Sequence, residues 1–417
     1  MKRIINLLFI SAFLIISCNT EDETLTTNDV NAENEYFVTL DSALQIANDF
    51  FYKLHNEDSS DTRLSIKRIV SNVTLLDVLG TKTRSSLSNI GGQVYLINYS
   101  NNNGFAIISA DKRLRPIYAI SDEGQLNLSD TIRNIPIKMF FDKLSIDVAN
   151  SLIESRNVPY VIHYDSCSYN VVASQAEPVL SRKVREWHQE YPYNNYCPVL
   201  SDGSHADVGC GAIACGMVCS HFQWPPKIVN RRLLWSGIRR GASIDDVAFF
   251  LRQLGIPENL DMEYTDVGSG SDFPNIIRTF QNLGYERPNN PQNFNESKVR
   301  SILDNAQDRT KGEGIVIVYG ENTNNPTAHI WVIDGYARNV YKYKQEELYS
   351  PKNTTLFHCV WGWNCNNGYF YWGNSKTLGG TTEVFDIDDN HSVLGDTDTH
   401  WYGNLKYISK FVAIRNY

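Results

Sequence analysis

The sequence predicts an α+β protein made of two successive domains, and three observations support this fold class. Near the N-terminus, apolar side chains recur every three or four positions over residues 43–54, and strand-like runs follow them. In the second half, segments with helical spacing come first, and runs rich in β-branched and aromatic residues come later. A chain of 417 residues with 42% hydrophobic content can build two or three domains with sizeable cores.

Residues 1–18 have the features of a bacterial leader. Two basic residues precede residues 4–16, an almost entirely apolar run that is too short to span a bilayer as a permanent helix. The run ends in Ser17-Cys18, which resembles a bacterial lipobox. We therefore expect a lipoprotein signal peptide, with Cys18 diacylated to become the new N-terminus. An ordinary secretory signal with an incidental cysteine is the alternative.

Residues 19–35 are polar and lack periodicity, so we expect a flexible tether. They include the acidic run Glu21-Asp22-Glu23, which resembles the surface-export tag of Bacteroidetes lipoproteins. Two or three acyl chains on Cys18 would anchor the chain stably in a membrane. The expected location is the cell envelope, at the outer membrane or the cell surface.

The sequence predicts a first α+β domain over residues 36–165. Thr39 or Asp41 can cap an amphipathic helix, and residues 100–103 form a credible turn between two strands. The predicted elements are a helix over 43–54, strands over 70–78, 93–99, 104–109 and 115–120, and a helix over 134–153. The domain has no cysteine and only two histidines, near its ends, so no catalytic set is expected in it. A generic binding module fits these residues as well.

Residues 166–177 are expected to link the two domains. The stretch Ser174-Gln175-Ala176-Glu177-Pro178 is mostly polar and lacks periodicity. Exposed segments of this kind are preferred sites of proteolytic cleavage. Processing is therefore expected here, and the sequence does not identify the bond.

The stretch from Gly209 to Pro225 predicts the central helix of the second domain, residues 178–417. Small residues fill its first half, and Pro225-Pro226 stops it, which leaves room for about three helical turns beginning at Cys210. A cysteine at a helix N-terminus lies at the positive end of the helix dipole, which favours the reactive thiolate. The alternative is a tightly packed buried helix in which cysteine is a small core residue.

This stretch resembles the nucleophile helix of the streptopain family of papain-like cysteine peptidases. Gly209-Cys210, the run of small residues and the aromatic exit at Trp224-Pro225 carry the resemblance. It implies a papain-like domain, with a helical half and a twisted antiparallel half, and makes Cys210 the nucleophile. It also implies that residues 36–165 are a streptopain-type propeptide, which acts as an intramolecular inhibitor. Helical spacing over 243–254, 273–283 and 297–306, before a buried strand at 314–320, agrees with that order of elements.

Gln189 is the candidate oxyanion donor, and the resemblance carries this role. It lies 21 residues before Cys210, in Gln189-Glu190-Tyr191-Pro192-Tyr193-Asn194, which is similar to the family pattern. The chemistry requires a neutral donor aimed at the developing charge, and the backbone N–H of the nucleophile supplies a second one.

His329 is the candidate base, 119 residues after Cys210, in a strand-like run over 328–336. A lone strand histidine is more often structural. Here, however, its surroundings resemble the family pattern of a small residue, His, apolar and aromatic residues, then Asp-Gly. The resemblance makes His329 the group that takes the thiol proton and later protonates the leaving amine. Asp334-Gly335 is expected to turn this strand into the next.

Trp361-Gly362-Trp363 resembles the family's tryptophan loop, which covers the histidine, and makes Trp361 a further site residue. The family usually has an asparagine immediately before this motif to orient the imidazole. Here that position is Val360, whose side chain cannot hydrogen bond, and a base in the wrong tautomer loses several orders of magnitude in rate. The nearby side chains that could replace the missing amide are Asn364, Asn366 and Asn367.

Composition argues against two other classes of partner. A net charge of −9 disfavours nucleic acid. The spacing of Cys210, Cys215 and Cys219 matches no common zinc site, so neither a metal nor another cofactor is expected. Of the eight cysteines, six remain after the lipid-bearing one and the nucleophile are set aside, and their pairing is not deducible.

Three functions fit these features. The first is a secreted or surface cysteine endopeptidase that is made as a zymogen and acts on protein or peptide substrates. The second is a catalytically weakened relative that binds peptides or proteins in the same cleft, as suggested by Val360. The third is a non-enzymatic adhesion or structural lipoprotein. The occurrence of Gln189, Cys210 and His329 together and in this order argues against the third.

Overall fold

The computed structural model describes most of the chain after residue 35. The predicted leader, the tether and Cys18 lie outside the described residues. None of the helices within the described ranges is long and apolar enough to cross a membrane. The described ranges are 36–56, 68–79, 92–127, 135–157, 167–321, 328–343, 354–363, 366–372, 386–388, 391–392 and 405–414.

The N-terminal domain, described over 36–157, has the predicted order of elements. They are α2 (Leu40–Asn56), β1 (Val70–Leu76), β2 (Val94–Tyr99), η2 (Ser100–Asn102), β3 (Phe105–Ser109), β4 (Ile117–Ser121) and α4 (Ile135–Asn157). The hydroxyl of Thr39 accepts the N–H of Ser42 at 3.3 Å, so Thr39 caps α2. Asn101 and Asn102 adopt positive φ in the turn between β2 and β3, a conformation that asparagine tolerates. The predicted hairpin is confirmed.

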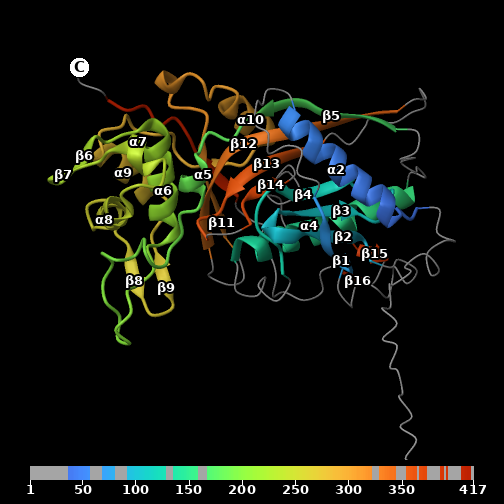
Figure 1. The fold of residues 1–417 in the computed structure, drawn as a ribbon, viewed down its shortest axis with the longest axis horizontal. Coiled ribbons are helices and arrows are strands. Elements are labelled where there is room, and N and C mark those ends of the chain that lie inside the picture. Colours follow the sequence, from blue (N-terminus) through green and yellow to red (C-terminus); the bar gives the residue numbers. More distant parts are fainter. Residues whose placement is uncertain are drawn as a thin grey trace, which may run out of the picture. The chain divides into compact units, whose positions relative to one another are not determined.

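Several helices of the C-terminal domain lie around α6 (Cys210–Phe222), as Figure 1 shows, whereas the helix over residues 296–303 packs against the sheet. Every residue of α6 after Cys210 is buried, and the helix packs against both β12 and α8. A Cβ on Gly216 would lie 2.7 Å from the side chain of Leu251, so small residues are what allow this close packing. The other helices are α5 (Arg182–Arg185), α7 (Trp235–Ile238), α8 (Ile244–Leu254), α9 (Asn275–Asn282), α10 (Glu296–Leu303) and η5 (Arg309–Lys311).

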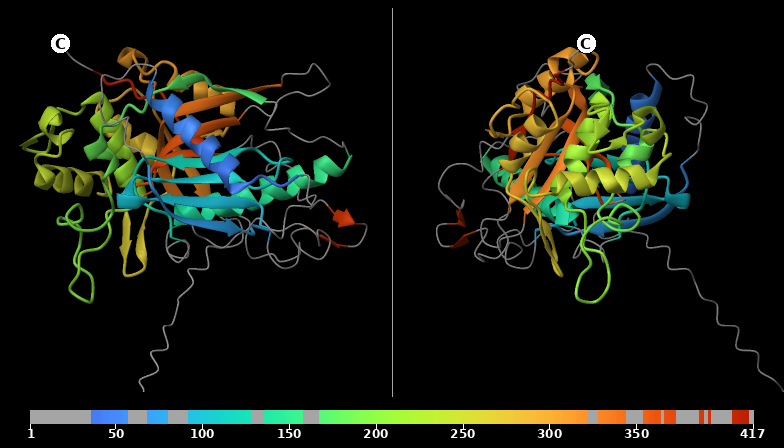
Figure 2. Two further views of the ribbon diagram at one scale, coloured as in Figure 1. Left: turned by 45° about the vertical axis from the view of Figure 1, so that its right-hand side comes forward. Right: turned by 90° about the vertical axis from the view of Figure 1, so that its left-hand side faces the viewer.

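Within the described residues, the strands of the C-terminal domain form one antiparallel sheet and three short hairpins. The sheet strands are β10 (Gln292–Asn293), β11 (Val316–Glu321), β12 (Ala328–Tyr343), β13 (Thr354–Val360), β14 (Gly368–Tyr371) and β17 (Lys406–Ile408). The hairpins pair β6 (Lys227–Ile228) with β7 (Arg231–Arg232), β8 (Glu263–Thr265) with β9 (Gly268–Gly270), and β15 (Asp386–Asp388) with β16 (His391–Ser392). The β8–β9 hairpin extends away from the helices (Figure 2). A helical half beside an antiparallel half is the papain-like arrangement that the sequence predicts.

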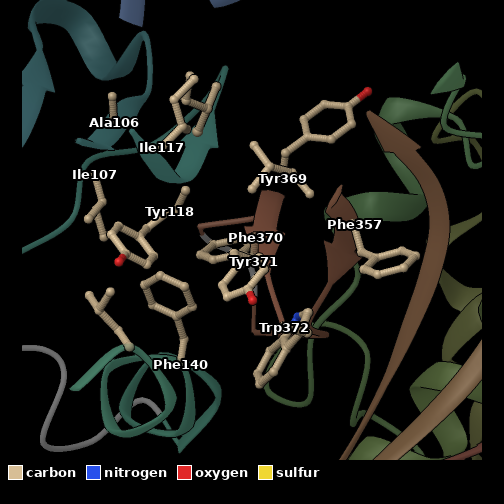
Figure 3. Close-up of a cluster of buried hydrophobic side chains, with 14 of the residues drawn as sticks. Ala106, Ile107, Ile117, Tyr118, Phe140, Phe357, Tyr369, Phe370, Tyr371 and Trp372 are labelled. Carbon is tan, nitrogen blue, oxygen red and sulfur yellow. The ribbon is translucent and has the colours of Figure 1, made fainter. Parts of the chain in front are cut away.

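The sheets of the two domains are continuous. Strand order runs β1-β2-β3-β4-β14-β13-β12-β11-β17-β10, because β4 pairs with β14 through Ile120–Tyr369 and Ala119–Phe370. A shared aromatic core accompanies this pairing, in which Phe140 of α4 lies 5.1 Å from Phe370 between ring centroids (Figure 3). The N-terminal domain therefore docks on the C-terminal domain through both backbone pairing and core packing.

The prediction that Asp334-Gly335 turns the chain is wrong. Strand β12 continues through both residues to Tyr343, and its pairing with β13 shows a bulge between Ile333 and Gly335. A Cβ on Gly335 would lie 2.7 Å from the carbonyl oxygen of Ala176. Glycine is needed here because another segment of backbone approaches closely, and not because the strand reverses.

The expected irregular linker over 166–177 is instead largely a strand, β5 (Cys167–Ala176), which pairs with β12 from Tyr336–Ala176 to Tyr343–Cys167. Strand β11 pairs with β12 only up to Ile333 and leaves the next part of that edge without a partner. An open edge favours the addition of a further strand. The backbone pairing that forms β5 is thus set by where β11 begins, at Val316, which the polar composition of the segment does not reveal.

Candidate active site

Cys210 is the first residue of α6, and the backbone before it explains the Gly-Cys pair. Gly209 adopts φ 89°, and a Cβ there would lie 2.7 Å from the sulfur of Met262. Cys210 is the only residue of α6 that is not fully buried. Even so, the surrounding protein raises the pKa of the Cys210 thiol through desolvation, which outweighs backbone hydrogen bonding from Ile330 and Gly211. Burial therefore opposes formation of the thiolate at this helix N-terminus.

His329 lies in β12 immediately before Ile330, which packs against the first turn of α6. A Cβ on Gly211 would lie 3.4 Å from Cδ1 of Ile330. The imidazole is 2% exposed, and its Nε2 lies 2.9 Å from the carbonyl oxygen of Trp361. Because a carbonyl only accepts, Nε2 must carry the proton, and Nδ1 is left with the lone pair of a base. The structure thus brings His329 and Cys210 to neighbouring positions with the correct tautomer for proton abstraction.

The side chains of Cys210 and His329, the candidate nucleophile and base, are not hydrogen-bonded to each other. No hydrogen bond between the described residues joins Cys210 Sγ to the ring of His329. Burial lowers the pKa of His329 to about 4, and the hydrogen bond to Trp361 offsets this only in part. Burial thus favours the neutral form of both groups, whereas the active pair of a cysteine peptidase is a thiolate and an imidazolium.

Acidification is expected to destabilise the full-length protein through His329. Its folded-state pKa of about 4 lies below the ordinary 6.5, so between these values the unfolded chain binds more protons and stability falls as pH falls. The contribution reaches about 3 kcal/mol at most. Urea unfolding between pH 7 and 4 measures it, and His329→Gln should flatten the curve. An unchanged pH dependence in that variant would contradict the assigned burial.

Gln189 is held beside the start of α6. It is 6% exposed, and its backbone carbonyl accepts the N–H of Val208 at 2.9 Å. The preceding residue, His188, forms an isolated β-bridge with Trp363. Gln189 therefore lies between the segment that leads into Cys210 and the tryptophan loop.

The tryptophan loop contacts His329 in a different way from the one that the motif suggests. The indole of Trp361 is buried among Trp331, Phe370 and Trp372, and only its backbone carbonyl contacts the imidazole. The rings that lie parallel to His329 belong to Trp331, at 6.2 Å, and Trp363, at 6.3 Å. Trp363 belongs to the loop that was expected to cover the histidine, whereas Trp331, two residues after His329, was not singled out from the sequence.

The missing asparagine at position 360 is replaced by main chain. The side chain of Val360 is 1% exposed and belongs to the core of the helical half. The Trp361 carbonyl accepts from Nε2 of His329, which is the contact that a side-chain amide would otherwise make. Of the three candidate asparagines, Asn367 accepts the Trp361 N–H at 3.0 Å, and Asn364 lies outside the described residues.

Cysteines and metal ligands add nothing further to the site. The described side chains of Cys197, Cys210, Cys215, Cys219 and Cys359 are all free thiols. Over the part of the chain that the structure describes, His, Cys, Asp and Glu form no group of three that could hold a metal ion.

Fold and site together define a cysteine peptidase domain with its own N-terminal inhibitor domain. Residues 187–239 and 230–371 match the Peptidase C10 family, and residues 35–148 match the family described as Spi protease inhibitor. Over these ranges the chain is similar to a Peptidase C10 peptidase domain that follows a Spi protease inhibitor domain.

Individual relatives are more distant. The thiol protease/hemagglutinin PrtT of Porphyromonas gingivalis is 24% identical over 324 residues, which are 66% of this chain and 33% of that protein. The chain thus spans about a third of the length of this curated relative. A prointerpain A fragment from Prevotella intermedia is 16% identical, with a TM-score of 0.47, over 76% of this chain and 95% of that one. The structure of active wild-type interpain A from Prevotella intermedia is 17% identical, with a TM-score of 0.35. The match covers 57% of this chain and 95% of that one.

Proposed function

We propose that this protein is a secreted or surface cysteine endopeptidase made as a zymogen. The observation that carries the proposal is the placement of Cys210 at the first turn of α6, packed on the strand of a histidine whose Nε2–H is already fixed by Trp361. Nδ1 of His329 would take the thiol proton, and the sulfur would attack the substrate carbonyl. The same imidazole would then protonate the leaving amine, and water would release the acyl group.

Gln189→Ala is expected to lower the rate constant for peptide hydrolysis by about 100- to 1000-fold, because one of two oxyanion donors is lost. The loss should fall on kcat, since the developing oxyanion exists only in the transition state. Steady-state kinetics on a peptide substrate measure it, normalised to titrated active sites. A change confined to KM would mean that Gln189 binds substrate and does not stabilise the oxyanion.

The inhibitor domain contacts residues that adjoin the candidate active site. Ser121 at the end of β4 donates to the backbone carbonyl of Asn367 at 2.5 Å, just beyond the tryptophan loop. A Cβ on Gly320 would clash with Cε of Met139 in α4, and Gly320 pairs with His329 across β11 and β12. The propeptide thus packs against both structural supports of the histidine, which suits an intramolecular inhibitor.

Limited proteolysis tests this proposal directly. The intact chain should hydrolyse peptides poorly, and activity should appear once the chain is cut at the junction near residues 166–177 and the propeptide leaves. Cys210→Ala should remain inactive after the same cut. Full activity of the intact chain would discard the zymogen, and lasting inactivity after propeptide removal would favour the alternative, a weakened relative that binds peptides in the same cleft.

The lipobox-like Ser17-Cys18 supports a lipid anchor at the outer membrane or cell surface as part of the same proposal. Cys18→Ala should release the protein from the membrane fraction or leave the leader uncleaved. Cell fractionation with mass measurement of the N-terminus reads both outcomes. Unchanged membrane partitioning together with normal processing would exclude lipidation at Cys18.

A further inference from the structure

A cluster of buried charged and polar side chains lies near the candidate active site and includes none of the proposed reacting groups. Asp334 in β12, His358 in β13 and Arg185 in α5 form it. Nδ1 of His358 lies 2.5 Å from Oδ1 of Asp334, and its Nε2 lies 3.3 Å from Nη1 of Arg185. A guanidinium only donates, so Nε2 accepts from Arg185 and Nδ1 donates to the carboxylate. The side chains of Asp334 and His358 are 0% and 4% exposed.

This cluster holds the first residues of the peptidase domain. Asp334 is the bulge residue of β12, and the bulge frees its backbone and side chain to reach beyond the ladder. Its backbone carbonyl accepts the N–H of Val179 at 3.2 Å, and its Oδ2 accepts the N–H of Leu180 at 3.0 Å. The chain is therefore anchored immediately after the segment in which cleavage is expected.

Asn367 connects this cluster to the catalytic histidine. Its Nδ2 donates to the backbone carbonyl of Arg185 at 2.9 Å, and its Oδ1 accepts the N–H of Trp361 at 3.0 Å. Trp361 in turn accepts from His329. The carbonyl that does so precedes Gly362, which has φ 73° and must be glycine because a Cβ would lie 2.9 Å from Ile213. Asn367 does not contact this peptide unit itself: it holds the N–H of the preceding unit, between Val360 and Trp361, and so restricts the backbone rotation of Trp361 that would redirect its carbonyl.

We infer that Asn367 is the positioning residue for His329, and that Arg185, His358 and Asp334 hold Asn367 in place as a histidine-positioning relay. This inference rests on the proposed function, because its kinetic test requires that the protein hydrolyse peptides. The relay orients His329 through a backbone carbonyl, which replaces the side-chain hydrogen bond that Val360 cannot make. Its other branch, the contact from Ser121 to the Asn367 carbonyl, places the propeptide on the same residue.

The kinetic test compares Asn367→Ala with Asn259→Ala as a matched control. The two asparagines are 7% and 6% exposed. Asn259 also donates to a backbone carbonyl, that of Gln253 at 2.8 Å, and accepts from Asn282 at 3.2 Å, without a link to His329. In cut, propeptide-free protein, Asn367→Ala should lower kcat by about 10- to 100-fold with little change in KM, and Asn259→Ala by less than about twofold.

Asn367→Asp keeps the acceptor for Trp361 and loses the donor to Arg185, so its kcat should lie between those of the wild type and Asn367→Ala. It also gives a second variant if the alanine form fails to fold. Rates are expressed per titrated active site, which removes the effect of lost stability. Equal kcat in Asn367→Ala and Asn259→Ala would overturn the inference.

A second readout does not depend on turnover. In full-length Cys210→Ala protein labelled with ¹⁵N-histidine, the ring of His329 should be the Nε2–H tautomer, and Asn367→Ala should convert it to a mixture. Retention of a pure Nε2–H tautomer in Asn367→Ala would contradict the relay. If the cut wild type hydrolyses no peptide, the proposed function fails, and this measurement still decides the relay by itself.

Discussion

His329→Ala should lower the turnover of cut, propeptide-free protein by about 10,000-fold or more, because proton transfer is lost in both half-reactions. The fixed Nε2–H and the adjoining thiol of Cys210 are the structural reasons. The measurement is kcat on a peptide substrate. Active-site titration fails for a variant that cannot form the thiolate, so folded protein must be counted by circular dichroism.

His221→Ala is the matched control for this variant. His221 is also a buried histidine of the peptidase domain, 2% exposed, whose pKa burial lowers to about 4. It lies in the last turn of α6, at the end opposite Cys210. Its removal should alter stability and leave kcat per folded molecule nearly unchanged. A similar loss of turnover in both variants would show that the effect of His329→Ala is structural.

Phe140→Ala should weaken the binding of the propeptide to the peptidase domain after the chain is cut. Its ring is 1% exposed and lies 5.1 Å from Phe370 and 6.5 Å from Trp372, both in the peptidase domain. Truncating a buried phenylalanine costs about 3 to 5 kcal/mol. In wild-type protein, the paired strands β4 and β14 and this core should keep the propeptide bound after cleavage, and activity should appear only as it dissociates. The variant should therefore gain activity faster after the cut.

Phe51→Ala controls for general destabilisation of the propeptide domain. Phe51 is 2% exposed and packs against Tyr99 at 5.5 Å, within the N-terminal domain. Size-exclusion chromatography of the two cut variants, at a temperature where both propeptides remain folded, separates docking from folding. If propeptide release is equally fast in wild type and Phe140→Ala, the shared aromatic core does not hold the inhibitor.

Much of the fold was predictable because local patterns dictated it. The hairpin between β2 and β3 has its own turn residues, Asn101 and Asn102, and α6 begins at Cys210 because the backbone at Gly209 excludes a side chain. These features depend on neighbours in sequence. The strand β5 and the bulge at Asp334 depend on segments about 160 residues apart in sequence, whose meeting leaves no periodic signal in either one.

The site was predictable in its residue types and less so in its contacts. Cys210, His329 and Gln189 were chosen by motif, and the structure brings the first two to neighbouring positions and holds the third at the approach to α6. Val360 suggested a histidine without an orienting partner. The partner is the Trp361 carbonyl, and a backbone carbonyl cannot be recognised from sequence because every residue has one. For this reason Val360→Asn is expected to bring little gain in turnover.

Labelling with a thiol-reactive peptide inhibitor tests whether Cys210 is the nucleophile of a latent peptidase. Intact and cut protein are treated in parallel, and the modified residue is located by peptide mass mapping. We expect one label per molecule on Cys210 in the cut, propeptide-free protein, little label in the intact chain, and none at that position in Cys210→Ala. Absence of label on Cys210 after propeptide removal, or equal labelling of intact and cut chains, would contradict it.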